Sequence, residues 1–162
     1  MEKKSNSNCN TSEKEGQTIV FPLFPMPPSS NKIYKHFLDR RSKKVRRVST
    51  DSLKQFNVES LRWKLHNKKL CEQAHELFKD EAYIKVVVQV GLHDDHIHTK
   101  KGKVRKMDVS NRGKALFDSI SKLIDVDDCH FFDVRLIKVK VEKNTIEHCK
   151  IFISKMNIFD MI

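Results

Sequence analysis

The sequence predicts a single α+β domain with a mixed β-sheet and two main helices, in the order β-α-β-β-α-β-β. Three observations support this fold class. A chain of 162 residues, 38% of them hydrophobic and 33% charged, is long enough to bury one core. Two segments carry apolar residues at helical spacing, and several shorter segments are rich in β-branched residues. No apolar run approaches the ~20 residues that a membrane-spanning helix needs.

The N-terminal part divides into a tail and the first elements of the domain. Residues 1–17 are polar, lack the apolar segment of a secretory signal and are expected to be disordered. The domain is expected to span residues 18–158 and to begin with a strand at Thr18–Phe24. Pro25–Asn31 ends this strand, because its consecutive prolines cannot continue a regular hydrogen-bond ladder. A basic loop is predicted to follow as far as Ser49.

A long helix is predicted over Asp51–Lys79, with a break near Asn67. No glycine or proline interrupts this segment, and its apolar residues recur mostly at helical spacing. Thr50 and Asp51 offer side-chain oxygens that can cap its first turn.

Strands and a polar loop are predicted on either side of a second helix. The β-branched segment Tyr83–Leu92 predicts a strand, and His93–Gly102 (HDDHIHTKKG) predicts a polar loop before a short returning strand at Lys103–Met107. The domain is expected to end in a hairpin of two strands: Phe131–Glu142 and Thr145–Lys155, with the turn at Lys143-Asn144.

The second helix is predicted at Asn111–Ile124. Steps of 100° per residue place its apolar side chains on one arc, formed by Leu116, Phe117, Ile120, Leu123 and Ile124. Lys114 and Asp118, four residues apart, project together from the opposite face.

Positive charge is concentrated in two segments of a chain whose formal net charge is +11. Residues 31–50 carry eight basic side chains against Asp39, and residues 99–114 carry seven against Asp108. Such concentration is typical of proteins that bind a phosphate backbone, whereas the alternative is a solvated face that aids solubility. The candidate nucleic-acid-binding residues are Arg40, Arg41, Lys43, Lys44, Arg46, Arg47, Lys101, Lys103 and Arg105.

Acidic residues gather around the second helix despite this basic background. Asp108 precedes the helix, and Asp127 and Asp128 follow it. Phosphodiester cleavage needs an activated water and stabilisation of charge, and Mg²⁺ held by one or two carboxylates supplies both. Lys114 would face the same site and neutralise a phosphate. These acids converge only if the strand after the helix runs back beside Asp108.

A structural explanation of the same residues stays open. Asp108 could stabilise the helix through its N-terminal dipole, Lys114 and Asp118 could form an i,i+4 pair, and Asp127-Asp128 could form a turn.

The four cysteines, at positions 9, 71, 129 and 149, are widely spaced without a C-x-x-C motif. We therefore expect reduced thiols in a cytoplasmic protein rather than a zinc site or two disulfides.

The sequence resembles the RusA-type Holliday junction resolvases in two separate segments. The family pattern D-x-D-N-x-x-K…F/L-D-A-L…D-D is similar to Asp108–Lys114, followed by Phe117–Ile120 and Asp127-Asp128. The family's proline-rich segment P-x-P-P-S-x-N-x-x-Y/W is similar to Pro25–Tyr34. The resemblance covers roughly residues 18–156.

This resemblance implies a homodimer in bacteria, encoded by a phage or prophage, that resolves four-way junction DNA by symmetric, Mg²⁺-dependent nicking. Mn²⁺ would be expected to substitute for Mg²⁺. Carried over by position, Asp108, Asp128 and Asp127 would bind the metal, and Lys114 would be the catalytic lysine. Asp118 also matches an acid of the pattern and is a further catalytic candidate.

The chain departs from the family pattern at Ser110, which replaces the second acid of the first motif. Three interpretations follow: a working site in which Asp118 or Asp127 substitutes for the missing acid, a weaker enzyme, or a DNA-binding protein that does not cut. We favour the first. A basic RNA-associated protein with structural acids is a further alternative.

The segment His93–Val104 is also unusual, because it carries three histidines and two aspartates before the first motif. Such a set could bind a transition metal. The alternative, which we prefer from sequence alone, is the polar tip of a hairpin.

Overall fold

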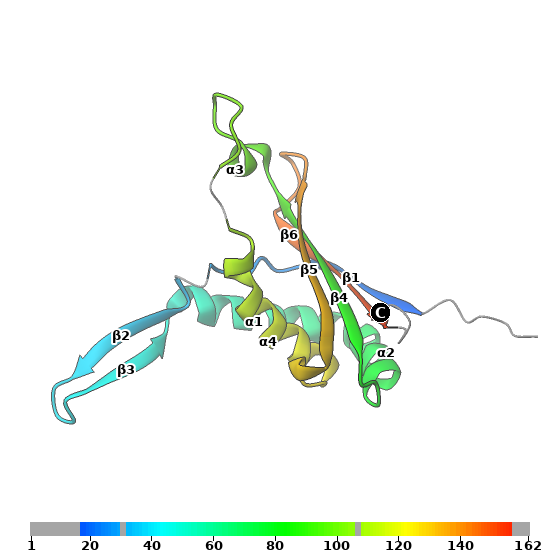
Figure 1. Ribbon diagram of the computed structural model, residues 1–162, viewed down its shortest axis with the longest axis horizontal. Coiled ribbons are helices and arrows are strands. Elements are labelled where there is room, and N and C mark those ends of the chain that lie inside the picture. Colours follow the sequence, from blue (N-terminus) through cyan, green and yellow to red (C-terminus); the bar gives the residue numbers. More distant parts are fainter. Residues whose placement is uncertain (1–16, 30–31, 106–107, 157–162) are drawn as a thin grey trace, which may run out of the picture.

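A four-stranded mixed sheet carries helices on one face, and a two-stranded hairpin projects away from it (Figure 1). The computed structural model describes residues 17–29, 32–105 and 108–156. Its elements confirm the predicted α+β domain. They are β1 (Thr18–Phe24), β2 (Tyr34–Asp39), β3 (Lys44–Ser49), α1 (Asp51–His66), α2 (Lys68–Phe78), β4 (Ile84–Leu92), α3 (Asp94–Ile97), a 3₁₀ turn η2 (Ser110–Arg112), α4 (Gly113–Ile124), a 3₁₀ turn η3 (Asp128–His130), β5 (Phe131–Lys140) and β6 (His148–Lys155).

The strands of the sheet lie in the order β1-β6-β4-β5. β4 pairs in parallel with β5 and antiparallel with β6. The predicted hairpin of β5 and β6 is therefore wrong, because β4 lies between them. The physical reason is the burial of β4, whose Ile84, Val86, Val88 and Val90 are fully buried. A strand this apolar gains most when both of its edges are paired and its buried face is covered by helices.

The core lies between this sheet and the helices. The sheet contributes Phe21, Ile151 and Ile153 together with alternate residues of β4, all fully buried. The predicted apolar arc of α4 faces this layer, and Leu116 and Ile120 are fully buried in it. Burying side chains of this size stabilises the fold by ~1.5–3 kcal/mol each.

The break in the long helix occurs where the sequence predicted it. α1 ends at His66 and is capped by Asn67, whose side-chain amide donates a hydrogen bond to the carbonyl of Trp63 at 2.9 Å. At the other end Thr50 caps α1, its hydroxyl accepting from the N–H of Leu53. Trp63 packs against two phenylalanines of β1, Phe21 and Phe24, with ring centroids 5.4 Å away in each case. Its role in this monomer is therefore core packing.

The predicted basic loop before Ser49 is wrong, because this segment forms the antiparallel β2–β3 hairpin. Asp39 stabilises its tip by accepting from the N–H of Arg41 and pairing with Arg46 at 2.9 Å. Lys43 adopts a left-handed conformation (φ 53°) in the turn. Charged residues occupy positions where a buried strand would be apolar, so the local pattern did not indicate a strand.

The segment between β4 and α4 also differs from the prediction. It begins with the single helical turn α3, and the predicted strand at Lys103–Met107 is reduced to one bridge between His98 and Val104. Lys106 and Met107 lie outside the described residues, as does the predicted tail up to residue 16. None of the described helices has the length and apolar character needed to span a membrane. The thiols of Cys71, Cys129 and Cys149 are free, while Cys9 is not described.

Candidate active site

Asp108 lies just before η2, on the surface, and is held by a neighbouring serine. One oxygen of its carboxylate, Oδ1, accepts hydrogen bonds from the backbone N–H of Ser110 at 2.9 Å and from the Ser110 hydroxyl at 2.7 Å. These hydrogen bonds, with the positive charge of Lys138 on β5, lower the pKa of Asp108. The carboxylate is therefore charged at neutral pH, and its second oxygen makes no hydrogen bond to described residues.

Asp127 and Asp128 lie beyond the other end of α4. Asp127 caps η3 by accepting from the backbone N–H of Cys129 at 2.9 Å. That hydrogen bond lowers the pKa of Asp127. Asp128 is exposed in the first position of η3, directly before β5. Both carboxylates are therefore accessible at the start of the strand.

α4 separates Asp108 from Asp127 and Asp128 within one chain (Figure 1). Its 12 residues correspond to ~18 Å of helix. β5 does run back along α4, which is the condition for the acids to converge. The residue of β5 that approaches Asp108 is Lys138, however, while Asp128 stays at the far end of α4. A single chain therefore does not bring the predicted acids to one point.

The spacing of possible metal ligands agrees with this separation. Among the described residues, one group of three or more His, Cys, Asp or Glu side chains has ligand atoms within 4.8 Å of one another, namely His93, Asp95 and His96. Asp108, Asp118, Asp127 and Asp128 are all described and form no such group. Any metal held by Asp108 needs further oxygen ligands from water, substrate or a second chain.

Lys114 and Asp118 lie in the first two turns of α4. Lys114 is exposed at the Asp108 end of the helix, and Asp118 is half-buried one turn further along. Neither forms a salt bridge within 4.0 Å to another described residue. The i,i+4 pair of the structural alternative is therefore not formed, and the Lys114 side chain is exposed to solvent.

Arg112 connects the two segments that resemble the family. Its guanidinium Nη1 donates to the carbonyl of Pro27, joining the proline-rich segment to the start of α4. Neither Arg112 nor Lys138 was predicted from the sequence as a site residue. Arg112 occupies a variable position of the quoted motif, and the approach of Lys138 to Asp108 depends on how β5 passes α4.

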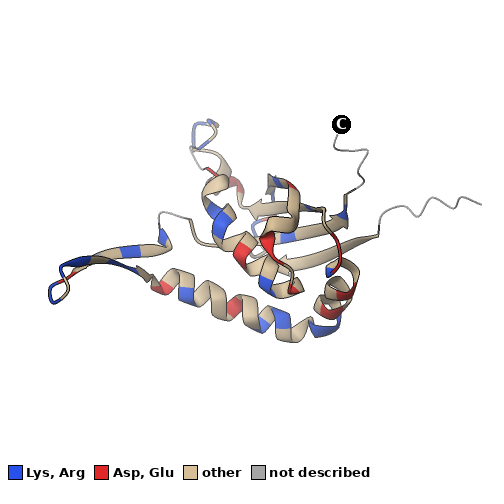
Figure 2. Cartoon of the chain, turned by 60° about the horizontal axis from the view of Figure 1, so that its bottom comes forward, with Lys and Arg blue, Asp and Glu red and all other residues tan. Residues whose placement is uncertain are grey.

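The nine predicted nucleic-acid-binding residues occupy two exposed places. Six lie on the β2–β3 hairpin, and Figure 2 shows basic residues along this projection. Arg47 of the hairpin stacks on Tyr34, with its guanidinium carbon 3.4 Å from the ring centroid. The others, Lys101, Lys103 and Arg105, lie in the loop after α3 and are exposed.

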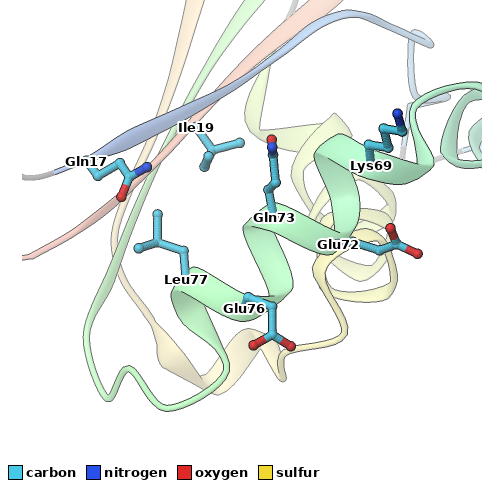
Figure 3. Close-up of a pocket in the computed structure, with 7 residues that line it drawn as sticks. All are labelled: Gln17, Ile19, Lys69, Glu72, Gln73, Glu76 and Leu77. Carbon is cyan, nitrogen blue, oxygen red and sulfur yellow. The ribbon is translucent and has the colours of Figure 1, made fainter.

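A shallow groove of about 630 Å³ lies between α2 and β1, away from these residues (Figure 3). Its lining mixes polar, charged and apolar side chains: Gln17, Ile19, Lys69, Glu72, Gln73, Glu76 and Leu77. Glu76 is already paired with Lys79 at 2.6 Å. The groove does not converge on a reactive group and is not part of the candidate site.

Comparison with known proteins places this geometry in a family. No curated protein matches the chain significantly. The family model of endodeoxyribonuclease RusA matches residues 25–151, which include the proline-rich segment, Asp108, α4 and η3. Since this match covers most of the 162 residues, the chain belongs to the RusA family of endodeoxyribonucleases, whose members resolve Holliday junctions.

Proposed function

We propose that this chain is a Mg²⁺-dependent nuclease that acts as a homodimer on four-way junction DNA in the bacterial cytoplasm, cutting one strand per subunit. Family membership supports the nuclease activity. The observation that carries the active-site assignment is the charged, exposed carboxylate of Asp108. It lies just before the end of α4 that also presents Lys114. Basic surfaces on both sides would bind the DNA backbone.

The chemistry of Asp108 fits a magnesium ligand. Mg²⁺ takes oxygen ligands and is commonly held by one or two carboxylates, with water and substrate phosphate completing its coordination. Ser110 occupies Oδ1 and leaves the other carboxylate oxygen for a metal. When bound, Mg²⁺ would supply a more acidic water and offset charge on the phosphate. Lys114 would neutralise the phosphate or the leaving oxygen at the same helix end.

The separation of Asp108 from Asp128 favours an active site completed by a second subunit. In a two-fold dimer, one end of α4 can face the opposite end of the partner's α4, because the symmetry axis reverses direction. Asp128 or Asp127 of the partner subunit would then approach Asp108. Each dimer would contain two such sites, one for each strand that is nicked.

β5 offers a surface for this dimer. It is the edge strand of the described sheet, and its Phe132, Val134 and Ile137 are 53%, 39% and 43% exposed. Unpaired edge strands readily pair with another chain. Antiparallel pairing of two β5 strands about Asp133 would set Asp128 of one subunit opposite Lys138 of the other. Lys138 is the residue whose charge reaches Asp108.

The basic hairpin and loop would contact phosphates on the arms of the junction. Thr50 anchors the base of the hairpin. Its backbone N–H donates a hydrogen bond to the carbonyl of Ile33 at 3.0 Å, and its hydroxyl donates one to the carbonyl of Lys32. The hairpin therefore joins α1 through a capped, hydrogen-bonded connection. Phosphate contacts of this kind would set affinity and orientation without reading base sequence.

Nicking of a synthetic four-way junction tests this function directly. The full-length protein is expected to cut the junction in Mg²⁺ or Mn²⁺ and to be inactive in EDTA. Asp108→Asn is expected to remove cleavage while leaving junction binding within about twofold. Asp125→Asn is the matched control, because Asp125 is an exposed aspartate two residues before Asp127 and outside the motif. Wild-type cleavage by Asp108→Asn would disprove the assignment.

A junction-binding protein that does not cut is the second candidate, favoured by Ser110 at the position of a motif acid. Here Ser110→Asp separates the two functions. A wild-type protein that binds the junction without cutting it, and that cuts after this substitution, would establish the second candidate. Cutting by the wild-type protein would eliminate it, whatever the substitution does.

A further inference from the structure

A second group of metal-binding side chains lies where β4 ends, apart from the carboxylates of the candidate active site. His93 follows β4 directly, and Asp95 and His96 lie on the single turn of α3. Their ligand atoms lie within 4.8 Å of one another. The ring centroids of the two histidines are 6.1 Å apart, and their planes are inclined by 33°.

Hydrogen bonds orient both imidazoles. Nε2 of His93 lies 2.7 Å from the carbonyl oxygen of Thr145, which can only accept, so this nitrogen carries the hydrogen and Nδ1 keeps a lone pair. Nδ1 of His96 lies 2.5 Å from the carboxylate of Glu147, which leaves the lone pair of His96 on Nε2. A carboxylate or carbonyl behind a metal-binding histidine commonly selects its tautomer in this way.

The neighbouring acids have different roles. Asp94 forms a salt bridge with Lys140 and a hydrogen bond with Nδ1 of His98, each at 3.0 Å, and these contacts, that of Lys140 first, lower the pKa of Asp94. Asp95 forms no salt bridge within 4.0 Å to another described residue. Glu147 also accepts from the backbone N–H of His93 at 2.8 Å, so it holds the start of α3 against the loop before β6. Asp95 is therefore the carboxylate left to join the two imidazoles.

We propose that His93, Asp95 and His96 form a binding site for a first-row transition metal ion such as Zn²⁺. Two imidazoles and one carboxylate suit these borderline ions, whereas Mg²⁺ prefers an all-oxygen environment. Tetrahedral ligands at 2.0–2.1 Å from zinc lie roughly 3.3 Å apart, so the exposed side chains of Asp95 and His96 would move closer to His93 when the ion binds. Water would complete the coordination.

The position of the site suggests what the ion would do. One groove is lined by His96 and Glu147 together with the basic side chains of Lys103, Arg105 and Arg112. The metal would tie the end of β4 to the turn of α3, which Glu147 already holds against the loop before β6, and would so restrain the basic loop that follows α3. It would act as a structural clamp on this DNA-facing loop rather than take part in cleavage.

Zinc titration of the full-length protein tests the site without reference to nuclease activity. Metal-free protein is titrated with Zn²⁺ alone in competition with a chromophoric chelator, in a Cys129→Ser background that removes an exposed thiol. One equivalent is expected to bind, with at least tenfold weaker affinity in Asp95→Asn and in His96→Ala. His66→Ala is the control, since His66 is an exposed histidine bonded to the carbonyl of Arg62 on α1.

Each outcome decides the proposal. Affinity that falls in both site variants and is unchanged in His66→Ala and Asp108→Asn supports it. Wild-type affinity in Asp95→Asn and His96→Ala overturns it, as does binding that is lost in Asp108→Asn but not in the site variants. Because Asp95 is exposed and makes no salt bridge to described residues, Asp95→Asn is expected to fold normally, which circular dichroism checks.

Zn²⁺ is also expected to slow trypsin cleavage after Lys100, Lys101 and Lys103. This protection should occur in the Cys129→Ser parent protein and not in Asp95→Asn or His96→Ala.

Discussion

Ser110 donates both its backbone N–H and its hydroxyl to the same carboxylate oxygen of Asp108. The residue that departs from the family's acidic motif is therefore a hydrogen-bond donor to the acid that remains. A second carboxylate at this position would instead repel Asp108 unless a cation lay between them. Ser110 keeps Asp108 charged and oriented without that repulsion.

Removing the Ser110 hydroxyl is expected to raise the pKa of Asp108. The hydroxyl is the first cause of its lowered pKa, so Ser110→Ala weakens the stabilisation of the charged form. A carboxyl whose pKa is lower in the folded state stabilises that state above the pKa of the unfolded chain, and this contribution is lost as the pH falls through the folded value. In Ser110→Ala that acid-sensitive contribution is smaller.

Titration of the aspartate carboxyl carbons by NMR measures this change. Ser52→Ala is the control, because Ser52 is exposed in the first turn of α1, far from the site in the chain. An unchanged Asp108 titration in Ser110→Ala would contradict the hydrogen-bonding explanation. If Asp108 acts as its charged form, the acidic limb of the cleavage profile should move to higher pH in Ser110→Ala.

Mixing two inactive variants tests whether the active site is shared between subunits. In a dimer of Asp108→Asn and Asp128→Asn subunits, a shared arrangement leaves one site with both acids intact and one site with neither. Cleavage of one junction strand is therefore expected to return in the mixture, to about a quarter of wild-type sites if subunits exchange randomly. If each site lies within one subunit, every site in the mixture lacks one acid, and activity does not return.

The proposed dimer surface on β5 is tested by introducing a charge at its edge. Ile137→Lys places an ammonium group at a position 43% exposed in the monomer. Burying this charge against a second β5 would be unfavourable, so sedimentation should detect monomers and cleavage should fall. Ile146→Lys is the control, since Ile146 is 85% exposed in the loop before β6. Ile137→Lys dimers of wild-type stability would place the interface elsewhere.

The basic hairpin is expected to bind phosphates, with a measurable effect of salt. Removing three phosphate contacts should make the slope of log K against log salt concentration shallower by about 2–3. The hairpin variant carries Arg40→Gln, Arg41→Gln and Lys44→Gln. A control variant of equal charge carries Lys54→Gln, Lys68→Gln and Lys69→Gln on α1 and α2. Equal slopes for the two variants, measured by fluorescence anisotropy on a four-way junction, would exclude a specific role for the hairpin.

Thr50 is expected to stabilise the folded protein through its side chain, because its hydroxyl caps α1 and the residue is buried, at 7% exposure. Thr50→Ala should lower the free energy of unfolding by about 1 kcal/mol, with about 2 kcal/mol as the upper end for a helix cap. Urea unfolding measures this value, and Ser52→Ala should change it by less than about 0.5 kcal/mol. Equal effects of the two substitutions would show that the Thr50 hydroxyl does not act as a cap.

Several elements were predictable from sequence because their signals are local. The strand at Thr18–Phe24 stops at prolines, the long helix is capped at Thr50 and breaks at Asn67, and the arc of α4 follows from helical periodicity. The motif around Asp108 and the proline-rich segment likewise indicated the family. In each case the decisive residues lie within a few positions of one another, so neighbouring side chains and backbone groups determine the outcome.

Tertiary structure decided the features that depend on distant partners. β4 lies between β5 and β6 because this order pairs both edges of the most apolar strand. The order depends on all four strands together and cannot be read from any one of them. The charged strands of the β2–β3 hairpin are ordered by pairing with each other rather than by an apolar face. The ~18 Å of α4 hold Asp108 and Asp128 apart, although both belong to one motif. Non-local hydrogen bonding and the rigidity of a helix, rather than residue spacing, thus determine which side chains can meet.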